Sequence, residues 1–121
     1  MGLFDVLKKK DTNSREDAQK WYTNGLELLH LGRFEEAVQA FDKAIKLDPQ
    51  SSAAWNDKGA ALCGLGRYEE AIQVLDKATE LDPNNPNTWA NKGLALDHLG
   101  EYDGAIQALD IAVELDPQKA V

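Results

Sequence analysis

Apolar and polar positions repeat along the chain with a period of 34 residues. The period is marked by tryptophan, at Trp21, Trp55 and Trp89, and by proline, at Pro49, Pro83 and Pro117. A fixed interval of this length indicates tandem copies of one structural unit, each too small to bury its apolar face alone. The sequence therefore predicts an N-terminal segment, residues 1–13, followed by repeats at residues 14–51, 52–85 and 86–119.

The middle repeat begins with the pattern of an amphipathic helix. Trp55, Gly59 and Leu62 follow an i, i+4, i+7 spacing and so share one helix face. Gly66 is placed to end this helix, because glycine adopts the left-handed conformation readily. We expect Gly59 to face an alanine of the second helix, which would let the two helices approach closely.

The second helix of the repeat carries Ala71, Leu75 and Ala78 at the same spacing. Pro83 ends it, since proline lacks an amide hydrogen and forces the preceding Asp82 out of the helical region. The two patterns together predict an all-α fold of helix-turn-helix units.

Twelve positions are identical in all three repeats, and most of them are apolar, small or chain-breaking. In the middle repeat they are Trp55, Gly59, Leu62, Leu65, Gly66, Ala71, Gln73, Asp76, Ala78, Leu81, Asp82 and Pro83. This pattern resembles the tetratricopeptide repeat family over residues 18–119. The resemblance implies antiparallel helix pairs stacked into a right-handed superhelical solenoid. It also implies a concave groove, lined by the first helix of each pair, that binds peptide segments.

The resemblance places eleven residues at groove positions: Tyr22, Leu26, Leu29, His30, Asn56, Asp57, Asn87, Asn91, Leu94, Asp97 and His98. In this arrangement the first repeat supplies an apolar end and the third repeat a polar end. A second interpretation is that Tyr22 and Leu26 only cover the exposed first helix or contact the N-terminal segment.

One branch of the family binds the acidic C-terminal tails of heat-shock chaperones through Lys, Asn, Asn, Lys and Arg. Here the five corresponding positions hold Tyr22, Leu26, Asp57, Asn87 and Asn91. None matches, and Asp57 would repel the bound carboxylate. We therefore expect that chaperone tails are not partners.

The charge of the chain adds a preference for the sign of the partner. The net charge of −8 lies entirely on residues 18–121, as −1 over residues 18–51, −3 over 52–85 and −4 over 86–121. Such a surface repels phosphate backbones and anionic lipids, so we expect a basic or neutral protein partner rather than nucleic acid or a membrane. Solubility alone is the other interpretation of the charge.

The sequence contains no recognisable catalytic or metal-binding constellation. His30 and His98 lie two repeats apart, roughly 15–20 Å, too far to share a metal ion with Cys63. We expect no enzyme activity, no cofactor and no metal. The single cysteine suits a reducing compartment, so we expect a cytoplasmic protein. Gly64 aligns with His30 and His98 of the flanking repeats. Its missing side chain either leaves a notch for a ligand side chain or is a glycine tolerated without function.

The N-terminal segment differs in character from the repeats. Its first ten residues, MGLFDVLKKK, place apolar and charged side chains on opposite sides of a helix. Packing on the repeats, packing on another copy, a weak membrane contact and disorder all remain as interpretations. We expect a hinge at residues 11–13 and a helix N-cap at Ser14, with Asp17 three residues on.

The third repeat lacks two charged residues that the first two repeats carry on their second helix. Its stripe of Gly104, Ala108, Ile111 and Leu115 is entirely apolar, which predicts an interface. Chance drift at Ile111 is the alternative. Three partners could cover this stripe: the same stripe of a second chain, the apolar side of the N-terminal segment formed by Leu3, Phe4 and Leu7, or a helix of another protein. Two functions therefore compete: a scaffold that binds peptides in its groove, and a self-assembly module that forms homo-oligomers.

Overall fold

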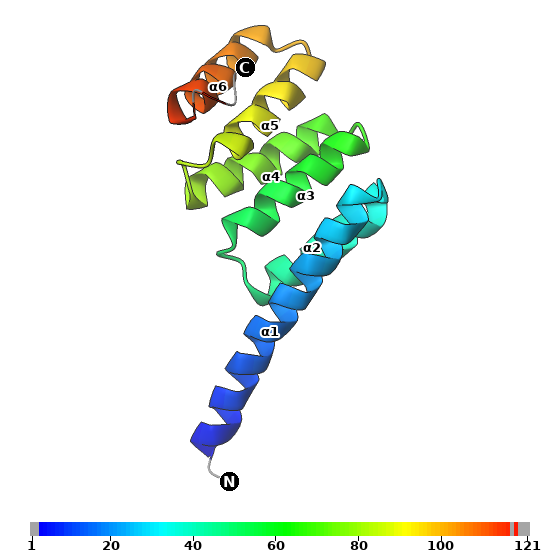
Figure 1. Ribbon diagram of the computed structural model, residues 1–121, viewed down its shortest axis with the longest axis vertical. Helices are drawn as coiled ribbons and strands as arrows, with labels where there is room; N and C mark the ends of the chain where they lie inside the picture. The colour runs from blue at the N-terminus through cyan, green and yellow to red at the C-terminus, as the bar shows by residue number, and fades with distance from the viewer. Residues whose placement is uncertain (1–2, 117, 119–121) are drawn as a thin grey trace.

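The computed structural model describes residues 3–116 and 118, with side chains from residue 14 onward, and forms an all-α helical repeat solenoid. Its helices are α1 (Leu3–His30), α2 (Phe34–Leu47), α3 (Ser52–Gly64), α4 (Tyr68–Leu81), α5 (Pro86–His98) and α6 (Tyr102–Leu115). Each repeat contributes one consecutive pair. Figure 1 shows the pairs stacked along the long axis of the molecule, with the two termini at opposite ends.

The helices form two layers, and the contacts between them indicate which layer is concave. The first helices, α1, α3 and α5, touch one another sideways as well as touching their own partners. Within the described residues, α2, α4 and α6 have no such lateral contacts with one another. Helices that spread apart on one side while touching on the other produce a curved array. The face of α1, α3 and α5 is therefore the inner face.

The turn inside each repeat is fixed by a glycine, as the sequence predicts. Gly66 has φ +75°, and Gly32 and Gly100 are equally left-handed. The amide of Gly66 donates to the carbonyl of Cys63 at 3.0 Å, and that of Arg67 to Leu62 at 2.9 Å. These two bonds satisfy carbonyl groups that the end of a helix would otherwise leave unpaired.

The connection between repeats is fixed by the aspartate, the proline and the next tryptophan. Asp82 leaves the helical region after α4, with φ −145° and ψ 94°, and its carboxylate accepts from the Asn84 amide at 3.1 Å. The indole of Trp89 then donates back to the Pro83 carbonyl at 2.8 Å, and Trp55 bonds Pro49 in the same way. These two tryptophans thus tie their helices to the end of the preceding repeat.

Close packing within each helix pair depends on the glycine of the first helix. A Cβ added at Gly59 would lie 2.5 Å from Cδ2 of the fully buried Leu75, and one at Gly25 would lie 2.5 Å from the ring of Phe41. The expectation that Gly59 faces an alanine is wrong, because the leucine on the same face of α4 occupies the space. The close approach itself is present.

Successive repeats are also joined by a lysine on each incoming first helix. Lys58 of α3 contacts Asp42 of α2 at 2.6 Å, and Lys92 of α5 contacts Asp76 of α4 at 2.7 Å. Each carboxylate is about half exposed, so each pair contributes at most about 1 kcal/mol. The pairs nevertheless fix the alignment of one repeat on the next.

The N-terminal segment is a continuation of α1 rather than a separate element. The helix runs without a break through residues 11–13, so the predicted hinge and the predicted N-cap at Ser14 are wrong. Ser14 does not begin a new helix, because residues 11–13 contain no proline or glycine that would interrupt α1. The side chains of Leu3, Phe4 and Leu7 lie outside the described part of the structure. None of the described helices is long and apolar enough to cross a membrane.

We predict that Gly59→Ala lowers the free energy of unfolding by about 1–3 kcal/mol, because the new methyl group overlaps Leu75. Gly104→Ala is the matched control. Its Cβ would meet Leu96 at an ordinary 3.4 Å, so the better helix propensity of alanine should leave stability unchanged or raise it by up to about 1 kcal/mol. Urea unfolding measures both. Equal midpoints for the two variants would contradict the close approach at Gly59.

Candidate functional site

The inner face brings the apolar groove candidates together at the α1 end. Tyr22, Leu26 and Leu29 are half-buried and pack against the core formed by α2, α3 and α4. The rings of Tyr22 and Phe41 lie 5.9 Å apart. These side chains therefore support the first repeat with one side and present the other side to the groove.

A hydrogen bond joins the first two inner helices across the groove. The Tyr22 hydroxyl donates to the Asp57 carboxylate at 2.7 Å. Burial, followed by the adjacent carboxylate, raises the pKa of Tyr22 well above its ordinary value. Burial also raises the pKa of Asp57, although the bond from Tyr22 and the nearby His30 act in the opposite direction.

A second hydrogen bond joins the next two inner helices in the same register. Nδ2 of Asn91 donates to Oδ1 of the buried Asn56 at 3.1 Å. Both bonds join residues 35 apart, one residue more than the repeat length. Neither cross-link was predicted from the sequence, because one pairs Tyr with Asp and the other Asn with Asn, although the shared offset of 35 residues was a usable signal. Four candidate residues thus hold one another in place across the inner face.

The remaining groove candidates lie mostly at the surface. Leu94 is 53% exposed, and His30, Asn87 and Asp97 are exposed as well. The ring of His98 packs against the preceding repeat, where it stacks on Tyr68 with 4.6 Å between centroids and 5° between planes. The third repeat therefore offers the groove an exposed leucine beside a carboxylate.

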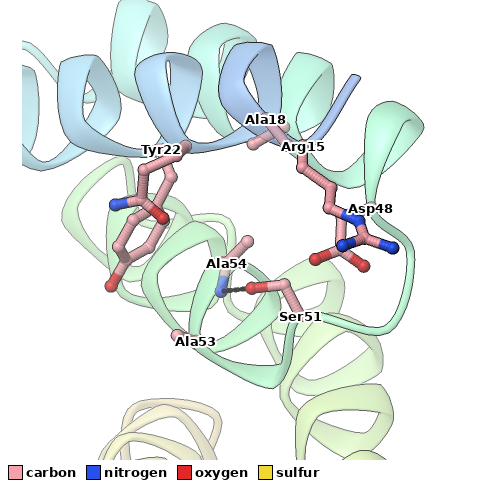
Figure 2. Close-up of a pocket in the computed structure, with 9 residues that line it drawn as sticks. Arg15, Ala18, Tyr22, Asp48, Ser51, Ala53 and Ala54 are labelled. Atoms are coloured by element: carbon pink, nitrogen blue, oxygen red, sulfur yellow. Dashed lines mark hydrogen bonds between the residues drawn. The ribbon is translucent and has the colours of Figure 1, made fainter. Parts of the chain in front are cut away.

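A hollow of about 360 Å³ opens beside the α1 end of the groove, between α1, the end of α2 and the start of α3. Its floor is made of alanines, including Ala18 and Ala54, and Tyr22 forms one wall. Figure 2 shows Arg15 and Asp48 on the opposite side, next to Ser51, whose hydroxyl accepts from the Ala54 amide at 3.3 Å. Arg15 was not predicted as a site residue, because it precedes residues 18–119, over which the chain resembles the repeat family.

The interpretation of Gly64 as a notch for a ligand is wrong. The ring of Phe34 occupies that space, and a Cβ on residue 64 would lie 2.7 Å from it. The neighbouring Cys63 is half-buried, and burial raises the pKa of its thiol. Across the described residues, no group of three or more His, Cys, Asp or Glu is arranged to hold a metal ion.

The predicted apolar stripe on α6 lies mostly against its own repeat. Ala108 is buried, Gly104 lies next to Leu96, Ile111 is half-buried and only Leu115 is exposed. The exposed apolar residues lie on the adjacent side of the helix: Tyr102, Ile106, Leu109 and Val113. The exposed apolar surface of α6 therefore lies on the side of the helix next to the predicted stripe. The prediction rested on which charged residues the third repeat lacks, and that pattern does not show which side of α6 packs on its own repeat.

Comparisons with known proteins agree on one family. Two family models described as tetratricopeptide repeat match residues 22–86 and residues 64–121. A comparison with curated protein sequences returns no match. Among solved structures, the chain is similar to the TPR2B domain of yeast Sti1 in complex with an Hsp70 peptide. That likeness has 30% identity and a TM-score of 0.82, and it covers 85% of this chain and 82% of the other.

Two further solved structures share the fold. The second TPR of Spaghetti (RPAP3), bound to the HSP90 peptide SRMEEVD, is 22% identical with a TM-score of 0.84, covering 89% of this chain and 99% of that one. The TPR domain of Arabidopsis OM64 is 25% identical with a TM-score of 0.85, covering 87% of both chains.

We predict that Tyr22→Phe lowers the free energy of unfolding by about 1 kcal/mol at neutral pH, because Asp57 loses a hydrogen-bond donor. The raised pKa of Tyr22 means that the folded protein holds the phenolic proton more tightly than the unfolded chain. Its stabilising contribution is complete below the unfolded pKa of about 10 and is lost as the pH rises above it. The variant should therefore lose less stability above about pH 10 than the wild type.

Urea unfolding at neutral and alkaline pH tests this prediction. Tyr102→Phe, at an exposed position, is the control and should change stability by less than about 0.5 kcal/mol. Identical pH profiles for wild type and Tyr22→Phe would contradict the bond to Asp57.

Proposed function

Because the chain belongs to the tetratricopeptide repeat family, we propose that it is a non-enzymatic protein-interaction scaffold that binds a peptide or helical segment of a partner in the groove of α1, α3 and α5. The observation that carries this proposal is the continuous inner face, on which the three helices touch sideways and are cross-linked by Tyr22–Asp57 and Asn56–Asn91. A surface held rigid in this way is preorganised, so binding a peptide orders few side chains of the scaffold.

Exposed apolar surface supplies the driving force for binding. Leu94 lies open at one end of the groove, and the half-buried Leu26 and Leu29 lie toward the other. The hollow beside Tyr22 is large enough for one side chain of the bound peptide. These features support an extended or helical segment that is anchored by two apolar residues.

Charge supports a basic or neutral ligand. Asp57 and Asp97 are the acidic groups among the groove candidates, and the chain as a whole carries a net charge of −8. Complementary charge raises the rate of association and repels partners of the wrong sign.

The same charges support the exclusion of acidic chaperone tails. Two of the structural neighbours are bound to peptides of HSP90 or Hsp70. In this chain Tyr22 stands where the carboxylate-binding branch carries a lysine, and it is bonded to Asp57, which stands where that branch carries a neutral asparagine. An incoming carboxylate would meet the charge of Asp57 without a neutralising lysine.

A cytoplasmic location is also part of this proposal. Its support is the single, half-buried Cys63, which has no second cysteine with which to form an internal disulfide.

We predict that Asp97→Lys weakens binding of a basic peptide by about 3- to 10-fold at low salt and reduces its salt dependence. Affinity capture with crosslinking identifies the ligand, and isothermal titration calorimetry at two salt concentrations measures the effect. Asp103→Lys, on an exposed residue of α6, is the matched control and should leave binding unchanged. Equal losses from both substitutions would show that overall charge, and not the groove, determines affinity.

We predict that the acidic peptide SRMEEVD does not bind measurably to this protein. Fluorescence anisotropy with a labelled peptide tests this, and the second TPR of Spaghetti serves as the positive control. Tight binding of SRMEEVD would contradict the exclusion of acidic tails.

A further inference from the structure

The outer side of α6 carries a continuous apolar face. Tyr102, Ile106, Leu109 and Val113 follow an i, i+4, i+7, i+11 spacing and are 62%, 58%, 36% and 41% exposed. These four residues are called the α6 face below. Exposed apolar strips of this kind usually mark an interface.

The equivalent positions in the first two repeats are covered by the next repeat. Val38 and Phe41 of α2 are 7% and 0% exposed, in a cluster with Ala61 and Leu62 of α3, and Ile72 of α4 packs against the Leu96 cluster of the third repeat. The side of α3 that lies on α2 includes the fully buried Ala54 and Ala61. The α6 face therefore has the shape and composition of a surface that accepts another helix.

The covered faces also show what chemistry such a helix brings. Asp42 and Asp76 each receive a lysine from the incoming helix, Lys58 or Lys92. Asp110 is the third member of this aspartate series, and no salt bridge to it is present within the described residues. Helix α6 contains no lysine or arginine, while Asp103 and Glu114 add to its negative charge. The face thus suits an apolar helix that carries lysine.

Charge disfavours two ways in which a second copy of the chain could cover the α6 face. Stacking the repeat portion of α1 onto the α6 face would bury Lys20 and Glu27, which align with Ala54 and Ala61 of α3. Pairing two α6 faces would bring two Asp110 side chains together without any cation on either helix. Burying unpaired charges costs more than an apolar contact of this size returns.

The N-terminal segment has the required composition. Residues 3–10 combine the apolar Leu3, Phe4 and Leu7 with Lys8, Lys9 and Lys10. In Figure 1 this part of α1 projects from the repeats at the end opposite α6. Helix α1 is continuous, and among the described contacts it touches α2 and α3 and none of the later helices, so the segment lies far from the α6 face of its own chain.

We infer that residues 3–10 of one copy dock on the α6 face of a second copy, with the lysine run facing Asp110 and Glu114. The contact is heterologous, since each copy donates a segment at one end and a face at the other. It produces rings or open head-to-tail chains, and it leaves the groove of every copy unoccupied. This inference is independent of the ligand proposed for the groove.

Two full-length variants separate the two halves of this interface. Phe4→Asp with Leu7→Asp removes the apolar side of the segment, and Ile106→Asp places a charge in the α6 face. Sedimentation velocity should show concentration-dependent association of the wild type and a monomer for each variant, with helicity retained in circular dichroism. Leu94→Asp, at a similarly exposed leucine in the groove, should associate like the wild type.

Mixing the two variants tests the direction of the contact. Each variant retains the half that the other has lost, so the mixture should form a 1:1 complex and no larger species. A charge exchange provides a second test that leaves the apolar residues intact. Asp110→Lys alone and Lys8, Lys9 and Lys10→Glu together should each weaken association, and mixing these two proteins should restore it.

Four results would overturn the inference. The first is a wild type that stays monomeric at every concentration. The second and third are association that persists in Phe4→Asp with Leu7→Asp, or in Ile106→Asp. The fourth is a mixture of these variants that remains monomeric. Persistence after the N-terminal substitutions would indicate pairing of α6 with α6. Persistence after Ile106→Asp would indicate that the segment docks elsewhere.

Discussion

The first helix of each repeat packs closely on the second helix because a glycine, which has no side chain, lies at the point of contact. At Gly25 and Gly59 the space that a Cβ would need is filled by Phe41 and Leu75, which are among the largest fully buried side chains. This close contact sets the separation of the two helices, and the separation determines where the next repeat begins. The helix propensity lost at glycine, about 1 kcal/mol, is offset by the burial of a whole ring or leucine.

The groove is a consequence of this spacing combined with the alignment of successive repeats. Each inner helix packs on its own partner and on an inner neighbour, and α3 and α5 also pack on the outer helix before them. The outer helices, which lack lateral contacts within the described chain, spread apart and curve the array. Tyr22–Asp57 and Asn56–Asn91 then bridge the narrower side, so side chains that appear suited to ligand binding also hold the curvature.

Features that depend on local residues could be predicted from the sequence, whereas features that depend on the packing direction could not. Gly66 ends its helix through bonds within five residues, and Pro83 acts on its immediate neighbour, so both were predictable. The bond between Tyr22 and Asp57 requires the relative rotation of α1 and α3, and no helical pattern contains that angle. The same limitation placed the α6 stripe on the wrong side. The helical extension of α1 was missed because short polar residues permit a hinge without enforcing one.

The three tryptophans occupy one position of the repeat but two kinds of surroundings. Trp55 and Trp89 donate to prolines of the preceding repeat, while Trp21 has the ammonium group of Lys43 at 4.1 Å from its ring centroid instead. Each of these two bonds closes the connection between two repeats, so unfolding of one connection breaks one indole hydrogen bond and changes the surroundings of one ring. The intrinsic fluorescence of the protein therefore contains a separate optical signal for each junction. Chains that retain one tryptophan at a time would reveal whether this short array unravels from one end or opens everywhere at once.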